Sequence, residues 1–542
     1  MSISFLQVKT KRMRYVLLCG LAITVCSGQL CGPDNPVNPA PPVITNFTAD
    51  PASIAPGQSS TLAWVVSGET SLSIDPAIGT VTGTSLTVSP STTTTYTLSA
   101  LNAVGTATAT ATITVSSPPP ANLFYVSPTG NDAGPGSESQ PWRTIQKAAD
   151  TLVAGQTVHI MAGTYAERVM PRNSGTVDNL ITFSAQPGAA VTIDGSGLTL
   201  PDDLAGLFEI AWNSYIRVTG LRVINARPYR DNGGILVLNS SFITIDGNST
   251  DHTSSSGIGV WASNHITIDS NTVEHAGEAG GQECISVAGT DTFEVRNNTV
   301  RFGRKEGICP KDGSSNGKVY RNVVDGPYRV GIYVDAWDKH THDIEIAQNV
   351  VCEVEGDGFA VACERSGLLE NIQILNNVAF HNQHLGMSVS INGDRPAHPM
   401  NNIQIVNNTF YNNGWTTWGG GIAVDNPDAQ NVVVRNNICS QNLFFQLVVG
   451  SGVPGQAVVI DHNLIDGYRG TEGEIRGSDY VEGGPMFTNP AAADFHLRPG
   501  SPAIDLGSPT GAPVNDFDGQ PRPLDGDHDG TAAWDIGAYE TP

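Results

Sequence analysis

The sequence predicts an all-β protein whose main body is a single-stranded, right-handed parallel β-helix, preceded by a small β-sandwich. The first observation is a degenerate repeat that runs from residue 204 to about residue 467. The second is an earlier region, residues 43–115, in which short alternating strands are separated by Pro, Gly and Ser turns. The third is that no helical period fits the repeat.

The repeat has the length and pattern of one coil of short strands. Each unit starts Gly-apolar-x-apolar and finishes apolar-x-apolar-x-Asn-x-apolar, as in GIGVWASNHITIDSNTV. The starting positions 234, 257, 284, 307, 331, 358, 386 and 421 lie 23 to 35 residues apart. Alternation of period two points every second side chain inward, so that Ile, Val and Leu of successive coils stack into one core.

Recurring Asn pairs stand where each coil turns, for example Asn376-Asn377 and Asn407-Asn408. Asn tolerates left-handed backbone angles, and stacked Asn side chains can hydrogen-bond along the ladder. We therefore interpret these pairs as structural. The amphipathic segment Thr144 to Leu152 is expected to help close the first end of the coil, because open strand edges need covering.

Composition sets the domain boundaries. Lys9, Lys11, Arg12 and Arg14 precede an apolar run too short to cross a bilayer, which is typical of a signal peptide. No later stretch is apolar for long enough to span a membrane, so we expect a secreted or cell-surface protein, and a monomer. The expected order is signal peptide 1–31, Pro-rich linker 32–42, β-sandwich 43–115, linker 116–122, β-helix 123–484 and a C-terminal tail module 485–542 packed on or capping the helix.

Charge restricts the partners. The net charge of −24 argues against nucleic acid, because phosphate binding needs a basic face, and it favours divalent cations. Nine of the 28 Lys and Arg residues nevertheless fall within residues 296–340. In so acidic a protein this local excess indicates an anionic polysaccharide as substrate.

Three segments carry a family resemblance. FYVSPTGNDAGPGSESQPWRTIQKAAD, followed by VHIMAGTY and the Asn-rich coils, resembles the pectate-lyase-like parallel β-helix superfamily over roughly residues 123–480. DFHLRPGSPAIDLGS and DIGAYE are similar to an anchor-type C-terminal module of bacterial surface and secreted proteins, and residues 43–115 resemble bacterial immunoglobulin-like modules. The resemblance implies architecture more than activity, since the superfamily holds polysaccharide lyases, glycoside hydrolases, epimerases and non-enzymatic surface proteins.

Ionisable residues gather at equal offsets of neighbouring coils, where a β-helix stacks them on one side. Glu283 and Glu306 share the offset before the apolar start, and Asp357 takes it two coils after Glu306. The candidate catalytic residues are Lys311, Asp335, Asp338, Glu306 and Asp357. The candidate substrate-binding residues are Arg329, Trp337, Lys339, His340, Glu364 and His384.

Two chemistries suit this patch. In β-elimination a base removes the proton alpha to a uronate carboxylate that Ca²⁺ or Arg neutralises; Asp335, Asp338 and Asp357 could bind Ca²⁺, and Lys311, with its pKa lowered by neighbouring cations, could be the base. By residue type the layout resembles the calcium-dependent lyases of the superfamily. Hydrolysis instead needs two carboxyl groups, which Glu306 and the same aspartates could supply without metal. We expect a lyase, with a hydrolase or a non-catalytic carbohydrate-binding surface protein as alternatives.

A second acidic cluster lies in the tail. Asp525, Asp527 and Asp529 alternate in DGDHDG before a turn glycine, as carboxylates do in calcium loops. The twelfth position from Asp525 is Ile536, where an EF-hand would have Glu. The pattern therefore predicts a turn that binds Ca²⁺ structurally.

Overall fold

A computed structural model describes residues 40–54, 58–115, 122–393, 396–415 and 418–542. The predicted signal peptide, residues 1–31, lies outside these described residues. The chain divides into two compact units between Val115 and Ser116. Among the described residues there is no helix with the length and apolar character that a membrane span requires.

The first unit consists of two small sheets, consistent with the predicted β-sandwich. In its third strand, buried Leu62 and Trp64 alternate with exposed Thr61 and Val65, so one face forms the core. One sheet has the order β1 (Val43–Asp50), β3 (Ser60–Ser67), β6 (Ser85–Val88). The other has the order β2 (Ser53–Ile54), β8 (Thr106–Val115), β7 (Thr94–Leu101), β4 (Ser71–Asp75), β5 (Gly79–Val81).

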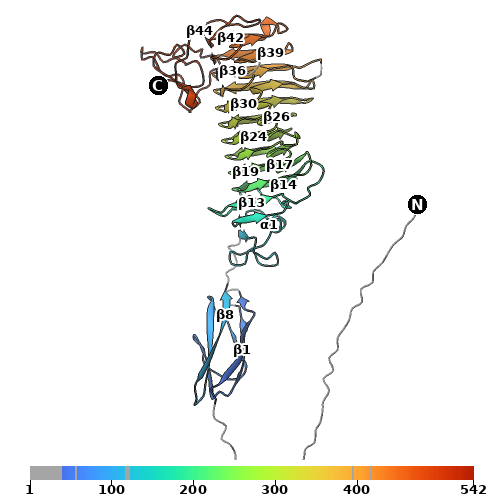
Figure 1. Ribbon diagram of the computed structural model, residues 1–542, viewed down its shortest axis with the longest axis vertical. Coiled ribbons are helices and arrows are strands. Elements are labelled where there is room, and N and C mark those ends of the chain that lie inside the picture. The colour runs from blue at the N-terminus through green and yellow to red at the C-terminus, as the bar shows by residue number, and fades with distance from the viewer. Residues whose placement is uncertain (1–39, 55–57, 116–121, 394–395, 416–417) are drawn as a thin grey trace, which may run out of the picture. The chain divides into compact units, whose positions relative to one another are not determined.

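The second unit is the predicted parallel β-helix, built from three parallel sheets to which most coils, or rungs, give one strand each (Figure 1). Sheet A consists of β14 (Ala205–Ala211), β17 (Asn232–Leu238), β20 (Ile258–Trp261), β23 (Ile285–Ala288), β26 (Ile308–Lys311), β29 (Val330–Asp335), β32 (Asp357–Ala362), β35 (Met387–Val389), β38 (Ile422–Val424) and β41 (Leu447–Val449).

Sheet B consists of β9 (Leu123–Val126), β10 (Thr157–Ile160), β12 (Ile181–Ala185), β15 (Ser214–Thr219), β18 (Ser241–Asp246), β21 (Asn264–Asp269), β24 (Asp291–Arg296), β27 (Ser315–Tyr320), β30 (His340–Ala347), β33 (Leu368–Leu375), β36 (Met400–Val406), β39 (Ala429–Arg435) and β42 (Val458–Asp461). Sheet C consists of β11 (Gly163–Tyr165), β13 (Val191–Asp194), β16 (Arg222–Ile224), β19 (Ser249–Asp251), β22 (Thr272–Glu274), β25 (Thr299–Arg301), β28 (Val323–Asp325), β31 (Val350–Cys352), β34 (Val378–Phe380), β37 (Thr409–Tyr411), β40 (Ile438–Ser440), β43 (Leu464–Asp466) and β44 (Val481–Glu482).

Inward side chains stack from rung to rung as the period-two pattern predicts. In sheet B, Ile245, Ile268 and Val295 occupy paired positions of successive strands and are fully buried. Such columns, meaning side chains at equivalent positions of successive rungs, fill the coil with one continuous apolar core. The five cysteines of the described residues are free thiols: Cys284, Cys309, Cys352, Cys363 and Cys439.

The second Asn of each predicted pair belongs to a buried hydrogen-bonded ladder at the turn between sheets B and C, and single asparagines continue this ladder on other rungs. Asn349, for example, accepts from the backbone N–H and the Nδ2 of Asn322, both at 3.0 Å. It donates from Nδ2 to the carbonyl of Val319 and to Oδ1 of Asn377, both at 2.9 Å. The structural interpretation of these asparagines is confirmed.

The first Asn of the pairs takes the left-handed conformation, with φ of +51° at Asn376 and +55° at Asn407. Their side chains face the tail module instead of the core. Nδ2 of Asn376 donates to the carbonyl of Asn515 at 2.8 Å, and Nδ2 of Asn407 donates to the carbonyl of Asp535 at 2.9 Å. These bonds attach the tail to the flank of sheet C.

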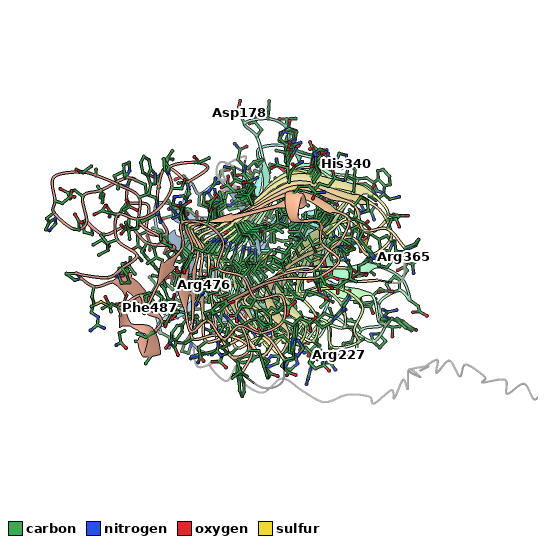
Figure 2. All side chains as sticks on the ribbon, turned by 90° about the horizontal axis from the view of Figure 1, so that it is seen from above. Asp178, Arg227, His340, Arg365, Arg476 and Phe487 are labelled. Carbon is green, nitrogen blue, oxygen red and sulfur yellow. The ribbon has the colours of Figure 1, made fainter. Side chains whose placement is uncertain are left out.

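Apolar contacts strengthen this attachment. Phe487 of β45 (Phe487–Asn489) and Phe495 of β46 (Asp494–Leu497) share a buried cluster with Val378 and Ile438 of sheet C. Seen along the coil axis, Phe487 lies on the opposite side of the coil from Arg365 (Figure 2). Short 3₁₀ turns occur at η1 (Gly455–Ala457) and η2 (Pro490–Ala492).

The predicted amphipathic segment forms α1 (Ile145–Thr151), whose first turn is capped because the Thr144 hydroxyl accepts from the backbone N–H of Lys147. Ile145, Ala148 and Ala149 are buried and join the same apolar core as the first rungs. The helix therefore covers apolar surface at the N-terminal end of the coil (Figure 1).

Replacing one ladder asparagine should destabilise the coil. Asn349→Ala leaves the backbone N–H and one of the two Nδ2 hydrogens of Asn322 buried without their acceptor, so we expect the free energy of unfolding to fall by about 3 kcal/mol. Gln373→Ala, on the exposed face of the next rung, is the control and should change it by less than about 0.5 kcal/mol. Urea unfolding followed by circular dichroism measures both, and equal effects would contradict the proposed importance of the ladder.

Candidate functional site

A cavity of about 390 Å³ opens on sheet A between β20 and β32. Its lining is charged and aromatic rather than apolar. The residues that line it are Arg230, Trp261, Gly281, Gln282, Glu283, Lys305, Glu306, Cys309, Lys311, Asp312, Arg329, Tyr333, Asp335, Trp337 and Glu364.

Strand register brings these residues together. Trp261 pairs with Ala288, and Ala288 pairs with Lys311 on the next rung. Because Ile308 pairs with Ile332, the same offset places Asp335 beside Lys311. Side chains two residues apart in a strand share a face, so Tyr333 joins Asp335 at the cavity wall.

Register also confirms the predicted stacking before the strands. Ile285 pairs with Ile308 and Val330 pairs with Asp357, which puts Glu283, Glu306 and Asp357 in one column. All of them lie along sheet A, on the same side of the coil as Asp335.

Glu283 is a buried carboxylate that contacts two lysines. Its Oε2 lies 2.7 Å from Nζ of Lys311 and accepts from the Ser286 hydroxyl at 2.7 Å, while its Oε1 lies 3.2 Å from Nζ of Lys305. Burial opposes its ionisation, but Lys311 and Lys305 outweigh burial and hold the pKa of Glu283 below its ordinary value. Glu283 is therefore an ionised anchor for two cations.

This pairing corrects the expectation for Lys311. Burial alone would lower the pKa of Lys311, but the carboxylate of Glu283 outweighs burial and raises it. The prediction that neighbouring cations lower it is wrong, because the closest charge is negative. A lysine held in its charged form by an ion pair is a poor general base.

The pKa of Glu306 is shifted in the opposite direction from that of Glu283. Nη1 of Arg329 contacts Oε1 of Glu306 at 3.1 Å, but the buried Oε2 of Glu306 has no hydrogen-bond partner. Burial, followed by the negative charge of Glu283, raises the pKa of Glu306. This side chain is thus biased toward the protonated acid.

Asp335 ends β29 at the cavity wall. Burial is the main cause that raises the pKa of Asp335 to about 7, and the neighbouring charge of Glu364 adds to it. Its Oδ1 accepts from the backbone N–H of Trp337 at 2.8 Å, which fixes the carboxyl group. The Tyr333 hydroxyl donates to Oε1 of Glu364 at 2.9 Å. A carboxyl group with a pKa near 7 is suited to proton transfer at neutral pH.

Other predicted residues lie outside this cavity. Asp357 and His384 line a second hollow of about 400 Å³, which shares Arg329 with the cavity. Burial raises the pKa of Asp357, whose Oδ2 accepts from the Ser388 hydroxyl at 2.8 Å.

Three more predicted residues point elsewhere. Asp338 and Lys339 pair with each other at 3.5 Å and are more than half exposed. His340 begins β30 of sheet B and contacts Glu370 at 3.1 Å. Their placement in the site is a wrong prediction, because the turn after Asp335 carries them around the corner of the coil.

The groove carboxylates do not form a metal cage. Among the described residues, two clusters of Asp, Glu, His or Cys bring three ligand atoms within 4.8 Å of one another, and the trio Asp335, Asp338 and Asp357 is not among them. These residues do not fit a bound Ca²⁺. In the tail, Asp505 rather than Asp529 joins Asp525 and Asp527 in such a cluster, and Oδ1 of Asp529 accepts from the backbone N–H of Thr531.

Sequence reasoning missed Arg230, Gln282 and Tyr333 as lining residues. The signal for Tyr333 was present, because it stands two positions before Asp335 in the strand and must share its face. Arg230 and Gln282 come from segments that precede β17 and β23, where no repeat pattern fixes direction.

Several solved structures are similar in fold. "Crystal structure of pectate lyase Pel9A" has a TM-score of 0.43 and 15% identity, covering 78% of this chain and 96% of that one. "The complex structure of XylC with xylose" has a TM-score of 0.46 and 14% identity, covering 77% and 98%. The hyperthermoactive exopolygalacturonase from Thermotoga maritima has a TM-score of 0.42 and 12% identity, covering 56% and 84%.

The strand order and the cavity lining define the protein as a parallel β-helix with a charged cavity on one sheet. Uncharacterized protein YwoF of Bacillus subtilis (strain 168) is 29% identical over 438 residues, which is 70% of this chain and 92% of that protein. Residues 124–437 match the family described as "Pel9A-like, right handed beta helix region". The chain belongs to this Pel9A-like right-handed β-helix family.

The raised pKa of Asp335 predicts a pH-dependent cost to stability. Between about pH 4 and about pH 7 the folded chain holds a proton that the unfolded chain has released, so this group's contribution to the free energy of unfolding falls as pH rises. Asp335→Asn removes that loss. We expect its melting temperature, relative to wild type, to increase with pH up to about 7 and then level off.

The matched control is Asp338→Asn, three residues away and exposed to water. Its melting temperature should run parallel to that of the wild type across the same pH range. A constant difference for Asp335→Asn would contradict the raised pKa.

Proposed function

We propose that this protein is an exported, carbohydrate-active enzyme that cleaves an acidic polysaccharide by β-elimination in the cavity of sheet A. The observation that carries the proposal is the Asp335 carboxyl group, with a pKa of about 7, in a cavity that four basic side chains also line. Proton abstraction next to a carboxylate requires both a base of that strength and a cation.

Arg329 is the cation best placed for the substrate. Lys305 and Lys311 are mostly buried and already paired with Glu283, whereas the Arg329 side chain is 51% exposed. Its fork of donors suits a carboxylate, and it stands where the two hollows meet. Bound there, a uronate would have its charge neutralised by arginine rather than by Ca²⁺.

Asp335 is then the base. Its carboxylate removes the proton alpha to the neutralised uronate carboxyl group, a carbon–carbon double bond forms, the glycosidic carbon–oxygen bond breaks, and the departing sugar oxygen takes up a proton from water. Trp261 and Trp337 line the same cavity and offer apolar faces to sugar rings. Each part of this route uses a residue within the one cavity.

Hydrolysis is the second candidate, and one specific observation favours it. Glu306 and Asp335 both line the cavity; burial favours the protonated form of Glu306, which could serve as the acid, and Asp335, with a pKa of about 7, could serve as the base once ionised. The products separate the two reactions. Elimination yields unsaturated uronates and reducing ends, hydrolysis yields reducing ends alone, and no product from pectate, alginate or glycosaminoglycans would favour a binding protein.

Asp335→Asn should lower kcat by about 100-fold or more on the polysaccharide that the wild type cleaves, since a positioned base contributes that much. Asp338→Asn, outside the cavity, should retain full activity. Because the base must be ionised, wild-type kcat should rise with pH through about 7 and then reach a plateau. Full turnover by Asp335→Asn, measured by absorbance of unsaturated products, would reject this site.

Arg329→Gln tests how the substrate charge is neutralised. We expect kcat/KM on a uronate polymer to fall by about 100-fold, whereas Lys339→Gln, an exposed basic residue outside the cavity, should have little effect. The wild type should stay active after dialysis against EDTA. Loss of activity in EDTA with recovery in Ca²⁺ alone would instead assign the neutralising charge to calcium.

A further inference from the structure

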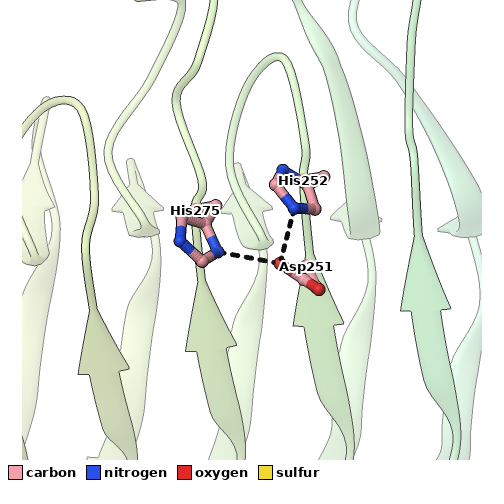
Figure 3. Close-up of side chains that lie close together, drawn as sticks. All are labelled: Asp251, His252 and His275. Carbon is pink, nitrogen blue, oxygen red and sulfur yellow. Dashed lines mark hydrogen bonds and ion pairs between the residues drawn. The ribbon is translucent and has the colours of Figure 1, made fainter.

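Asp251, His252 and His275 form a cluster at the end of sheet C strands, apart from the residues that line the cavity (Figure 3). Asp251 ends β19, and His252 and His275 directly follow β19 and β22. Asp251 pairs with Glu274 in the sheet, so the two histidines occupy equivalent positions of adjacent rungs. Both have left-handed backbones, with φ of +53° and +43°.

The two imidazoles face one carboxylate oxygen. Their rings stack at 4.7 Å between centroids with planes 8° apart. Nδ1 of His275 lies 3.1 Å from Oδ1 of Asp251, and Nε2 of His252 lies 3.7 Å from the same atom. The three possible ligand atoms lie within 4.8 Å of one another, and a small movement would bring them to the spacing of about 3.4 Å expected around a tetrahedral ion.

The other contacts of His252 and Asp251 leave the space between the three ligand atoms available for an ion. Nδ1 of His252 lies 2.8 Å from Oε1 of Glu278, and the other oxygen of Asp251 contacts Arg222 at 2.9 Å. A neutral imidazole has one N–H. If His252 donates it to Glu278, the lone pair of Nε2 faces the Oδ1 of Asp251, and the two acceptors repel each other unless a proton or a metal cation lies between them.

A histidine that binds a metal through one ring nitrogen usually donates the N–H of its other ring nitrogen to a carboxylate. Glu278 takes this role toward His252, and Arg227 pairs with Glu278 in turn. The ion pair holds the carboxylate in place and thereby fixes the imidazole with Nε2 toward Asp251.

We propose that Oδ1 of Asp251, Nε2 of His252 and Nδ1 of His275 bind one divalent transition metal ion, of the class that imidazole and carboxylate prefer and that Zn²⁺ represents. The three side chains are partly exposed, so water can complete a tetrahedral shell. The ion joins two adjacent rungs at one point.

One loop connects this cluster with the cavity of sheet A. Glu278 lies in the segment between β22 and β23, and Gly281, Gln282 and Glu283 of that segment line the cavity. Nη2 of Arg230, another lining residue, donates to the carbonyl of Gly280 at 3.1 Å. Metal binding therefore braces the loop that positions Glu283, independently of which reaction the cavity performs.

The test is a Zn²⁺ titration of the untagged full-length protein by isothermal calorimetry, in excess Ca²⁺ and Mg²⁺ to saturate carboxylate-only clusters such as the tail one. The variants are His252→Asn and His275→Asn, because Asn tolerates the left-handed backbone. His265→Asn is the matched control: His265 also has a left-handed backbone and a stacked ring, but its Nδ1 faces Asn264.

We expect wild type and His265→Asn to bind one equivalent of Zn²⁺ more than either site variant. Glu278→Gln should weaken that equivalent by about 10-fold or more. Zn²⁺ should raise the melting temperature of the wild type and of His265→Asn, but not that of His275→Asn. Equal stoichiometry in the wild type and both site variants would overturn the proposal. The proposal would also be overturned if Zn²⁺ left the melting temperature of the wild type unchanged while protonation of these histidines changed it.

Discussion

The hydrogen bond from one rung's asparagine to the next is the interaction on which the rest of this structure depends. Asn298, Asn322 and Asn349 each accept the backbone N–H of the preceding ladder asparagine and donate to a carbonyl of the preceding rung. Since these groups are buried, a shift by one residue would leave several of them unpaired and turn the apolar face outward. The ladder therefore fixes register, and register decides which side chains meet.

Fixed register explains how a site arises from residues far apart in sequence. The cavity exists because Lys311 and Asp335 are held side by side, with Glu283 and Glu306 stacked just before them. These carboxylates are largely buried, so each charge changes the proton affinity of its neighbours. The pKa values therefore differ between neighbours: two lysines hold Glu283 ionised against the effect of burial, whereas burial keeps Asp335 protonated up to about pH 7.

The limits of sequence-based prediction follow from the same geometry. The period of the repeat predicted the coil and the column of Glu306 and Asp357, because within strands position alone sets direction. It failed for Asp338, since beyond the end of β29 the turn and not the alternation decides where a side chain points. The prediction of a lowered pKa for Lys311 failed as well, because the charge that decides it belongs to Glu283 on the preceding rung. Sequence spacing does not show how closely these two side chains approach each other.

Columns also distinguish structural positions from positions free to acquire function. From β16 on, the residue after each sheet C strand has a left-handed backbone, and this column holds several residue types, among them Asn225, His252, His275, Phe302, Glu353, His381 and Asn412. Asn suits this backbone at least cost, since its short side chain can bond locally. The fold therefore does not require imidazole there, and each histidine needs another reason. His252 and His275 lie on adjacent rungs and face the same oxygen of Asp251, and Glu278 contacts the other ring nitrogen of His252. This arrangement is explained if the two histidines are metal ligands rather than parts of the turn.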